Sequence, residues 1–306
     1  MSKIERLKHL DARNKELARL ISVAEQTKSE DRYGLKKELY RNKIEMIEII
    51  TTEEKRAGVT ARELKRLVEL RPKVPRYETG VKPLDDALRG GIEIGTFIQL
   101  AGESGVGKTH LTLEILSNIA NYSKVVFFNF EMGDTRIVKR LNRLLSRDEQ
   151  WDNMIIDRDS RSLEALCNEI VLYARDGVKF FTIDSKMKIE VGGNDDEYKK
   201  YSTITKELAK ISQQYDIIIF LINQMSEADI KTKRLAFKGS GDQQYDSDIS
   251  LFYVKDENEN RMLICNKNRQ DEELFSLELN IDKNGRTINR ISCEVTEYKV
   301  DMPNNL

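Results

Sequence analysis

FIQLAGESGVGKT, residues 97–109, decides the fold of this 306-residue chain. The mostly apolar run Phe97–Ala101 predicts a buried strand, and a helix is expected from Lys108 to about Asn121. Between them, the spacing G-x-x-x-x-G-K-T places glycines where backbone N–H groups can turn inward and cradle phosphates. Because the loop follows a strand and opens a helix, the stretch predicts a P-loop nucleotide-binding domain.

The loop also predicts its ligands, ATP and Mg²⁺. A helix N-terminus carries partial positive charge that suits phosphate. Lys108 is expected to reach the β- and γ-phosphates, and the Thr109 hydroxyl to bind Mg²⁺. The residues expected to bind the nucleotide are Gly102, Glu103, Ser104, Gly105, Val106, Gly107, Lys108, Thr109 and His110.

Three polar residues end later predicted strands. Glu131 follows the apolar run 124–130, Asp184 follows 179–183, and Gln224 comes soon after 217–222. The carboxyl ends of parallel strands meet at one edge of a sheet, so all three are expected beside the phosphate loop. There Glu131 can polarise the attacking water, Asp184 can hold Mg²⁺ through water, and Gln224 can contact the γ-phosphate. Each residue also has a simpler interpretation. Glu131 would cap the helix that begins near Asp134, Asp184 would be an acidic loop residue, and Gln224 would be a plain turn residue.

The composition argues against several other classes of protein. The formal net charge is −1, from 51 basic and 52 acidic residues, and no run approaches 18 apolar residues. We therefore expect no membrane partner and no secretory signal, and we expect a cytoplasmic location. His9 and His110 are the two histidines, too few for a histidine metal site or a Ser–His–Asp triad. The three cysteines form no C-x-x-C pair, as in reduced cytosolic proteins.

The chain is expected to divide into four parts. Residues 1–70 are highly charged, with apolar residues at helical spacing and a Thr60-x-x-Glu63 capping box, which predicts a small all-α region. It is either a helical hairpin or an assembly and partner-docking module. Two prolines mark residues 71–79 as a linker, residues 80–298 as an α/β domain follow, and 299–306 form a tail.

Within the α/β domain, helices are expected at 134–145, 161–175 and 197–215, alternating with continuously apolar strands. Such strands are typical of a parallel sheet covered on both faces. The segments 249–254, 261–266, 275–281 and 287–291 are expected to be antiparallel strands.

Several of these segments resemble a known family. TGVKPLDDALRGGIEIG, residues 79–95, together with the phosphate loop resembles the RecA-type ATPase core. FNFEMG, residues 128–133, resembles DnaB-type replicative helicases more than RecA. GSGDQQYDSDISLF, residues 239–252, and CNKNR, residues 265–269, resemble the family's SGxIEQDAD segment and KxR hairpin. The resemblance covers roughly residues 76–292 and leaves out the first 70.

The resemblance implies roles for particular residues. Lys108 and Glu131 would be catalytic, the latter as the catalytic carboxylate, Asp184 the Mg²⁺-side acid and Gln224 the γ-phosphate sensor. Arg269, with Lys267 beside it, would be an arginine finger for a neighbouring subunit's ATP, unless it is a plain surface residue. A finger in trans requires a ring or filament, and the family implies a hexamer.

Two loops would face the central channel of such a ring. Basic, glycine-containing loops suit the sugar–phosphate backbone of single-stranded DNA, although charged loops are often simply solvated. Phe237 is the one aromatic candidate for base stacking in the second loop, and the acidic residues 195–197 in the first would repel phosphate. The residues expected to bind DNA are Lys186, Lys188, Lys231, Lys233, Arg234 and Lys238.

The sequence therefore favours an ATP-dependent helicase or translocase of the DnaB type acting on single-stranded DNA during replication. Residues 1–70 would dock a primase or a loader. One alternative is a RecA- or RadA-like recombinase or mediator, against which residues 130–132 and the Lys-x-Arg hairpin argue. Another is a KaiC-like regulatory ATPase that acts on protein partners.

Overall fold

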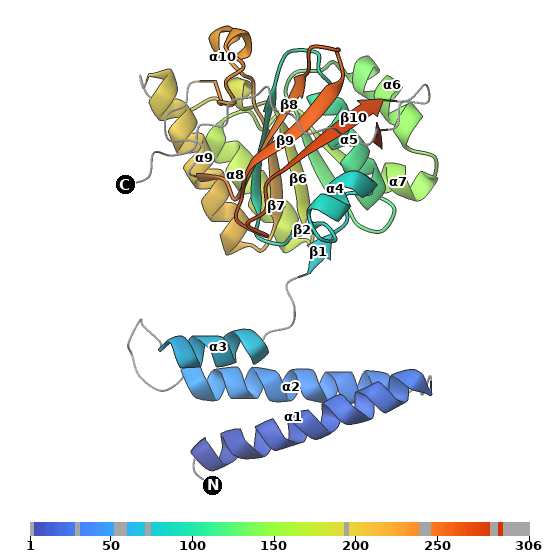
Figure 1. Ribbon diagram of the computed structural model, residues 1–306, viewed down its shortest axis with the longest axis vertical. Helices are drawn as coiled ribbons and strands as arrows, with labels where there is room; N and C mark the ends of the chain where they lie inside the picture. Colours follow the sequence, from blue (N-terminus) through green and yellow to red (C-terminus); the bar gives the residue numbers. More distant parts are fainter. Residues whose placement is uncertain are drawn as a thin grey trace. The chain divides into compact units, whose positions relative to one another are not determined.

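The computed structural model describes residues 3–27, 31–51, 60–70, 75–192, 196–238, 246–281 and 287–289. The chain divides into two compact units, Met1–Val74 and Pro75–Leu306 (Figure 1). Among the described helices, none has the length and apolar character that a membrane span requires. The expected tail 299–306, Cys293 and the resembling stretch 239–245 lie outside the described residues.

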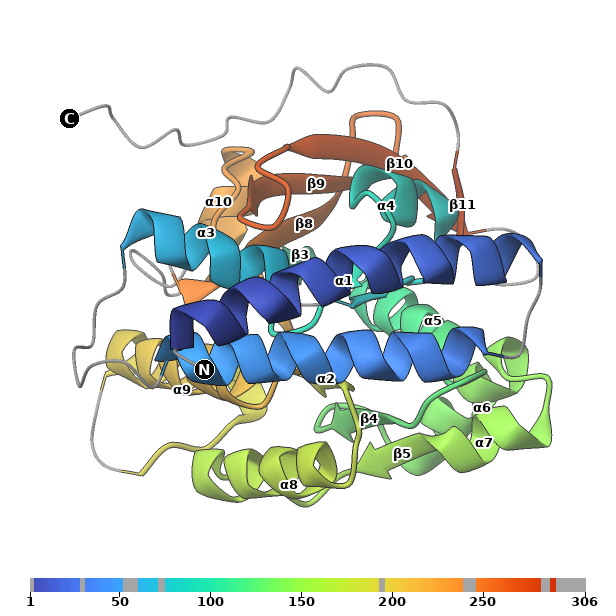
Figure 2. The same cartoon turned by 90° about the horizontal axis from the view of Figure 1, so that it is seen from below.

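The first unit is built on a helical hairpin. Helices α1 (Lys3–Gln26) and α2 (Arg32–Thr51) lie side by side and antiparallel (Figure 2). Their contact buries a short apolar row that includes Leu10, Leu17 and Met46. Helix α3 (Ala61–Leu70) begins after the predicted capping box, which is confirmed: the Thr60 N–H donates to Glu63 Oε2 at 2.8 Å, and the Glu63 N–H to Thr60 Oγ1 at 3.2 Å.

The second unit is centred on a nine-stranded sheet in the order β11-β10-β9-β8-β3-β7-β6-β4-β5. The six strands from β8 to β5 are parallel, and the C-terminal strands β9, β10 and β11 are antiparallel to their neighbours. This is the RecA-like architecture that the sequence predicts. The strands are β3 (Phe97–Gly102), β4 (Val125–Asn129), β5 (Met154–Asp157), β6 (Phe180–Asp184), β7 (Ile218–Ile222), β8 (Ile249–Lys255), β9 (Arg261–Asn268), β10 (Phe275–Ile281) and β11 (Thr287–Asn289).

Helices cover both faces of the sheet because alternate strand residues point to opposite sides. Ile98 and Phe127 pack with α5 and α6 on one face, whereas Phe97 and Phe128 pack with α8 and α9 on the other (Figure 1). The helices of this unit are α4 (Lys82–Ala87), α5 (Lys108–Ile119), α6 (Asp134–Leu144), α7 (Asp148–Asn153), α8 (Leu163–Arg175), α9 (Glu197–Gln214) and α10 (Glu227–Lys231), with the 3₁₀ turn η1 (Lys186–Lys188).

Two of the predictions about the fold are wrong. Strand β8, predicted to be antiparallel, runs parallel to β3 and is antiparallel only to β9. The chain leaves β7 at one sheet edge and returns to the other, where the Asp248 N–H bonds the Phe97 carbonyl, and a crossover of this length permits parallel pairing. Residues 75–79, predicted to be linker, belong to the second unit: Arg76–Tyr77 form β1, which pairs with β2 (Ile92–Glu93).

Candidate functional site

The phosphate loop adopts a turn that its glycines make possible. Gly105 and Gly107 have φ values of +76° and +116°, in the left-handed region that favours glycine. Gly102 allows a close approach, because a Cβ there would lie 2.0 Å from the Tyr253 carbonyl oxygen on β8. Lys108 is buried, and its ammonium donates to the Gly102 and Glu103 carbonyls at 2.9 and 2.8 Å. The loop and the lysine are thus prearranged around the N-terminus of α5.

Thr109 and Asp184 meet directly. The Thr109 hydroxyl donates to Asp184 Oδ2 at 2.6 Å, and Asp184 is almost fully buried at the end of β6. Burial raises the pKa of Asp184 to about 6, against the Thr109 hydrogen bond that lowers it. A hydroxyl and a carboxylate in contact supply the oxygen donors that Mg²⁺ prefers, so these two residues fit the expected metal site.

Glu131 lies exposed at the end of β4, and its Oε1 accepts a hydrogen bond from the Ser185 hydroxyl. The helix-cap alternative is wrong, because the residue that caps α6 is Gly133, with no side-chain cap. Asn129 fixes the turn before Glu131: its side chain accepts from the Met132 N–H at 3.0 Å and donates to the Met132 carbonyl at 2.7 Å. The carboxylate is therefore held beside Asp184.

A cavity of about 460 Å³ brings the predicted residues together at the carboxyl edge of the sheet. Residues of the loop line it with His110, and Glu131, Asp184 and Gln224 lie on its walls. Inside the cavity the ionisable groups interact: burial lowers the pKa of Lys108, and the charges of Asp184 and Glu131 act against that shift. The strand-end rule thus places all three polar residues correctly around the loop.

Three arginines that the sequence reasoning missed also line the cavity. Arg140 and Arg143 come from α6, and Arg261 comes from β9, where its Nε donates to the Val106 carbonyl at 2.8 Å. The spacing of Arg136, Arg140 and Arg143 along one helix face was a usable signal; Arg261 carried none. The cavity thus has four basic groups, counting Lys108, against two carboxylates. This surplus of positive charge suits a triphosphate.

Arg269 lies away from this cavity, beside the amino ends of the parallel strands, whereas the cavity lies at their carboxyl ends. Strand β9 runs antiparallel to β8, so Arg261 at its start is beside the phosphate loop and Arg269 just beyond its end is not. The backbone N–H of Arg269 donates to the carbonyl of Asp248. The N–H of Asp248 in turn donates to the carbonyl of Phe97 at the start of β3. The Arg269 side chain is 54% exposed. Within one chain, therefore, the predicted finger and the phosphate loop lie at opposite ends of the parallel strands, and the guanidinium of Arg269 is 3.6 Å from Asp248 Oδ1.

The first predicted DNA loop is only partly exposed. Lys186 is buried, with its ammonium 4.4 Å from the centre of the Tyr201 ring, and burial lowers its pKa to about 7. Its prediction as a DNA contact is therefore wrong for this conformation, because a backbone phosphate cannot reach it. Lys188 is exposed, and Gly193 and Asp195 lie outside the described residues.

The second loop folds into a small structure of its own. Phe237 is buried, with its ring centre 4.9 Å from that of Phe252 on β8, so it is a core residue and not a base-stacking platform. Lys231 and Arg234 are exposed, and Lys233 pairs with Glu257 at 2.7 Å. The Lys238 N–H donates to the Gln224 carbonyl at 2.9 Å, which ties the loop to the predicted sensor.

Comparison with known proteins agrees with this geometry. The sequence model of the DnaB-like helicase C-terminal domain matches residues 77–150. The DNA repair protein RadA of Aquifex aeolicus (strain VF5) is 28% identical over 155 residues, 50% of this chain and 33% of that protein. RadA of Campylobacter jejuni subsp. jejuni serotype O:2 is 28% identical over 201 residues, 63% of this chain and 42% of that protein. The chain spans less than half the length of these curated relatives.

Solved structures show the same fold. One solved ATPase domain superposes with a TM-score of 0.64 at 20% identity, covering 77% of this chain and 100% of that one. A DnaB-like replicative helicase, described with its interactions with primase, gives 0.62 at 20% identity, over 89% and 76%. The KaiC-like protein PH0186 from Pyrococcus horikoshii OT3 gives 0.59 at 18% identity, over 71% and 99%. The chain therefore has the RecA-like fold, and its residues 77–150 are similar to the DnaB-like helicase C-terminal domain.

Proposed function

We propose that this protein is an ATP-dependent translocase of the DnaB type that moves on single-stranded DNA and unwinds duplexes during replication. The observation that carries the proposal is the position of Arg269 at the sheet edge opposite the phosphate loop. An arginine so placed does not reach the nucleotide site of its own chain, so a role in hydrolysis would have to be at the site of another copy. The match of residues 77–150 to the DnaB-like helicase domain favours a helicase over other ATPases with this fold.

The cavity residues divide the hydrolysis chemistry among them. Lys108 exchanges the Gly102 and Glu103 carbonyls for phosphate oxygens when nucleotide enters. Thr109 and Asp184 would hold Mg²⁺, which would neutralise charge on the phosphates. Glu131, oriented by the Ser185 hydroxyl, accepts a proton from the attacking water. Arg140 and Arg143 offset the negative charge that develops on the γ-phosphoryl group, and Gln224 contacts that group.

A second copy then supplies the remaining cation. Arg269 enters the neighbouring site as an arginine finger, with Lys267 beside it. Because the donating and accepting surfaces differ, the contact is heterologous, and repetition of it closes a ring, which we propose to be a hexamer. An arginine supplied in trans contributes about 10³–10⁵ in turnover in related phosphoryl-transfer systems.

The DNA contact is proposed for the loops that follow Asp184 and Gln224 at the cavity edge. Lys188, Lys231 and Arg234 are exposed there, and Lys233 and Lys238 flank them. Their charges suit the phosphates of a strand read without base specificity. The Lys238–Gln224 hydrogen bond gives the nucleotide site a direct mechanical link to this loop.

The N-terminal unit is proposed to serve assembly or the docking of a primase or loader. Its hairpin leaves apolar side chains exposed, among them Leu20, Val23 and Tyr40, at 42%, 57% and 54%. Leu20→Lys with Val23→Lys is expected to lower the oligomer mass or the affinity for purified primase. Unchanged values for both would argue against this role.

The deciding experiment measures ATP hydrolysis and strand displacement together. Purified protein with Mg²⁺ and ATP should show hydrolysis stimulated by oligo-dT and displacement of a strand from forked DNA. Hydrolysis without any DNA binding at low salt would favour the KaiC-like regulatory ATPase. Filaments that exchange homologous strands, in place of closed rings in electron micrographs, would favour the recombinase, the alternative to which the 28% identity with RadA lends support.

A further inference from the structure

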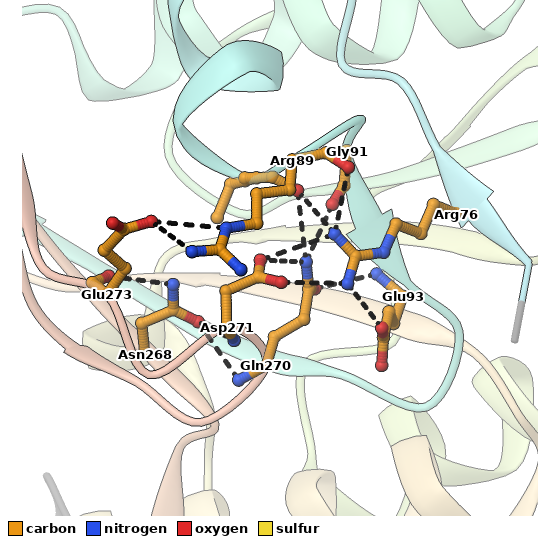
Figure 3. A network of polar contacts seen from close by, with 9 residues as sticks. Arg76, Arg89, Gly91, Glu93, Asn268, Gln270, Asp271 and Glu273 are labelled. Carbon is orange, nitrogen blue, oxygen red and sulfur yellow. Dashed lines mark hydrogen bonds and ion pairs between the residues drawn. The ribbon is translucent and has the colours of Figure 1, made fainter.

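A polar network joins the start of the ATPase unit to the turn that follows β9 (Figure 3). The Arg76 guanidinium on β1 donates to Asp271 Oδ1 at 2.9 Å and to Glu93 Oε1 at 2.7 Å. It also donates to the Leu88 carbonyl at 2.8 Å. The Asp271 carboxylate is only 5% exposed, so this ion pair is shielded from water far more than a surface pair.

Gln270 fills the same network with its side-chain amide (Figure 3). Its Nε2 donates to the Gly91 carbonyl at 2.9 Å and to Asp271 Oδ2 at 2.9 Å, while its Oε1 accepts from the Glu93 N–H at 2.9 Å. The side-chain amide of Gln270 therefore links two segments, because it forms hydrogen bonds with the residues around β2 and with the turn itself.

The turn is also fixed from within. Asn268 Oδ1 accepts from the Gln270 N–H at 3.1 Å and from the Asp271 N–H at 3.2 Å, and the Asn268 amide donates to the Glu273 carbonyl at 3.0 Å. Arg269 lies between Asn268 and Gln270, and its own N–H is bonded to the Asp248 carbonyl at 2.9 Å. Hydrogen bonds thus fix the backbone N–H of Arg269 and the residues that follow it in the turn.

The Arg269 side chain contrasts with this backbone, because more than half of its surface is exposed. A short surface turn needs few bonds, and taking a carboxylate such as Asp271 out of water carries a desolvation cost. The guanidinium lies 3.6 Å from Asp248 Oδ1 at its base and is otherwise largely exposed. A rigid backbone beneath such a cation suits contact with a fixed point on another molecule.

We propose that Arg76, Gln270 and Asp271 are positioning residues, which aim Arg269 at the nucleotide of a second copy. The inference rests on the proposed role of Arg269 in trans. These residues touch neither substrate nor cofactor within their own chain, and they act by fixing the turn. Their loss should therefore reduce turnover at the neighbouring site and leave the cavity of their own chain intact.

The test compares Gln270→Ala and Arg76→Ala with a control at another ion pair between the same two segments. Each variant is expected to lower kcat for ATP at least tenfold, with the Kd for a fluorescent ATP analogue unchanged within twofold. Arg89→Ala is the matched control, because its pair with Glu273 bridges the same two segments but is 61% exposed at both ends. Its kcat should stay within twofold of the wild type. Arg76→Lys keeps the positive charge but loses the forked guanidinium that donates to two carboxylates at once. Its kcat should therefore lie between that of Arg76→Ala and that of the wild type.

Mixing subunits separates aim from stability. Glu131→Gln subunits cannot hydrolyse ATP but carry an intact Arg269 turn. Added to Gln270→Ala or Arg76→Ala subunits, they should restore ATPase activity, because the variant's own cavity then receives a correctly held finger. Activity lost together with melting temperature and not restored by mixing would mean that the network serves only the fold, and would overturn the inference.

Two further outcomes are distinct. Full kcat in Gln270→Ala and Arg76→Ala, beside a deficient and rescuable Arg269→Ala, would overturn the positioning role and leave the finger standing. Full kcat in Arg269→Ala would instead overturn the proposed function on which the inference depends.

Discussion

The Thr109 hydroxyl donates a hydrogen bond to Asp184 at 2.6 Å, which joins the phosphate loop to a strand end 75 residues further along the chain. The Asp184 side of the contact is buried, at 1% exposure, whereas Thr109 is half-buried at the wall of the cavity. The pair is therefore both the expected Mg²⁺ site and a source of pH dependence.

Asp184→Asn is expected to stabilise the nucleotide-free protein at neutral pH. Burial raises the pKa of Asp184 from 3.8 to about 6, so the folded chain holds this proton more tightly than the unfolded chain. The free energy of unfolding should therefore fall as the pH rises from about 4 to about 6, and the loss should persist above that range. Removing the charge should recover roughly 2–3 kcal/mol at 1.36 kcal/mol per pKa unit. Chemical denaturation across this pH range measures it. The exposed Glu131→Gln should show no such gain, and an equal gain there would assign the effect elsewhere.

Lys108→Ala is expected to abolish Mg²⁺-dependent ATP hydrolysis, with a loss of at least about 10²-fold, because the buried ammonium is the proposed phosphate ligand of the loop. Isothermal titration with an ATP analogue and a turnover assay measure the two effects. The control is Lys124→Ala, an exposed lysine before β4. Wild-type turnover in Lys108→Ala would contradict the assignment of the cavity.

Arg269→Ala is expected to leave nucleotide affinity intact and lower kcat by about 10³-fold or more. The Arg269 side chain does not reach the cavity of its own chain. Subunits that lack only the Glu131 carboxylate still carry Arg269, so they should restore hydrolysis in the cavity of an Arg269→Ala neighbour. A titration of Arg269→Ala against Glu131→Ala subunits should show a maximum of activity at intermediate ratios. A flat response at every ratio would make Arg269 a plain surface residue.

Arg140→Ala and Arg143→Ala test the arginines that the cavity contributes from its own chain. Each should lower kcat/KM by about 10-fold or more, since a preorganised cation near the γ-phosphoryl group is lost. Arg136→Ala on the same helix is the matched control, because it is exposed and does not line the cavity. Equal effects in all three would mean that the helix, and not the cavity charge, is being disturbed.

Lys231→Ala and Arg234→Ala should each weaken binding to oligo-dT by a similar factor for every sequence and lower the salt slope by about 1. The measurement is fluorescence anisotropy at several salt concentrations. Lys82→Ala on α4, 84% exposed, serves as the control for a lost surface charge. An unchanged slope in both loop variants would remove α10 and its loop from the DNA path.

The sequence by itself determined the features that depend on neighbours along the chain. The loop 102–109 needs a strand, glycines and a helix start in succession, and all are local. Glu131, Asp184 and Gln224 could be grouped because parallel strands share one edge, a rule that converts strand ends into spatial neighbours without knowledge of side-chain packing. The capping box at Thr60 was predictable for the same reason, since its bonds span three residues.

The tertiary structure alone decided the features that depend on contacts between distant segments. Lys186 and Phe237 have the sequence context of exposed loop residues, but Tyr201 and Phe252, which belong to the next helix and strand, pack against them. Strand order made β8 parallel to β3 and brought Arg261 to the phosphate loop, 155 residues away in sequence. It also placed Arg269 at the opposite end of the strands and joined its turn, through Gln270 and Asp271, to Arg76 and the segment before β2. Hydrophobic periodicity identifies which face of an element is buried, but it carries no record of which partner buries it, and only the folded sheet supplies that partner.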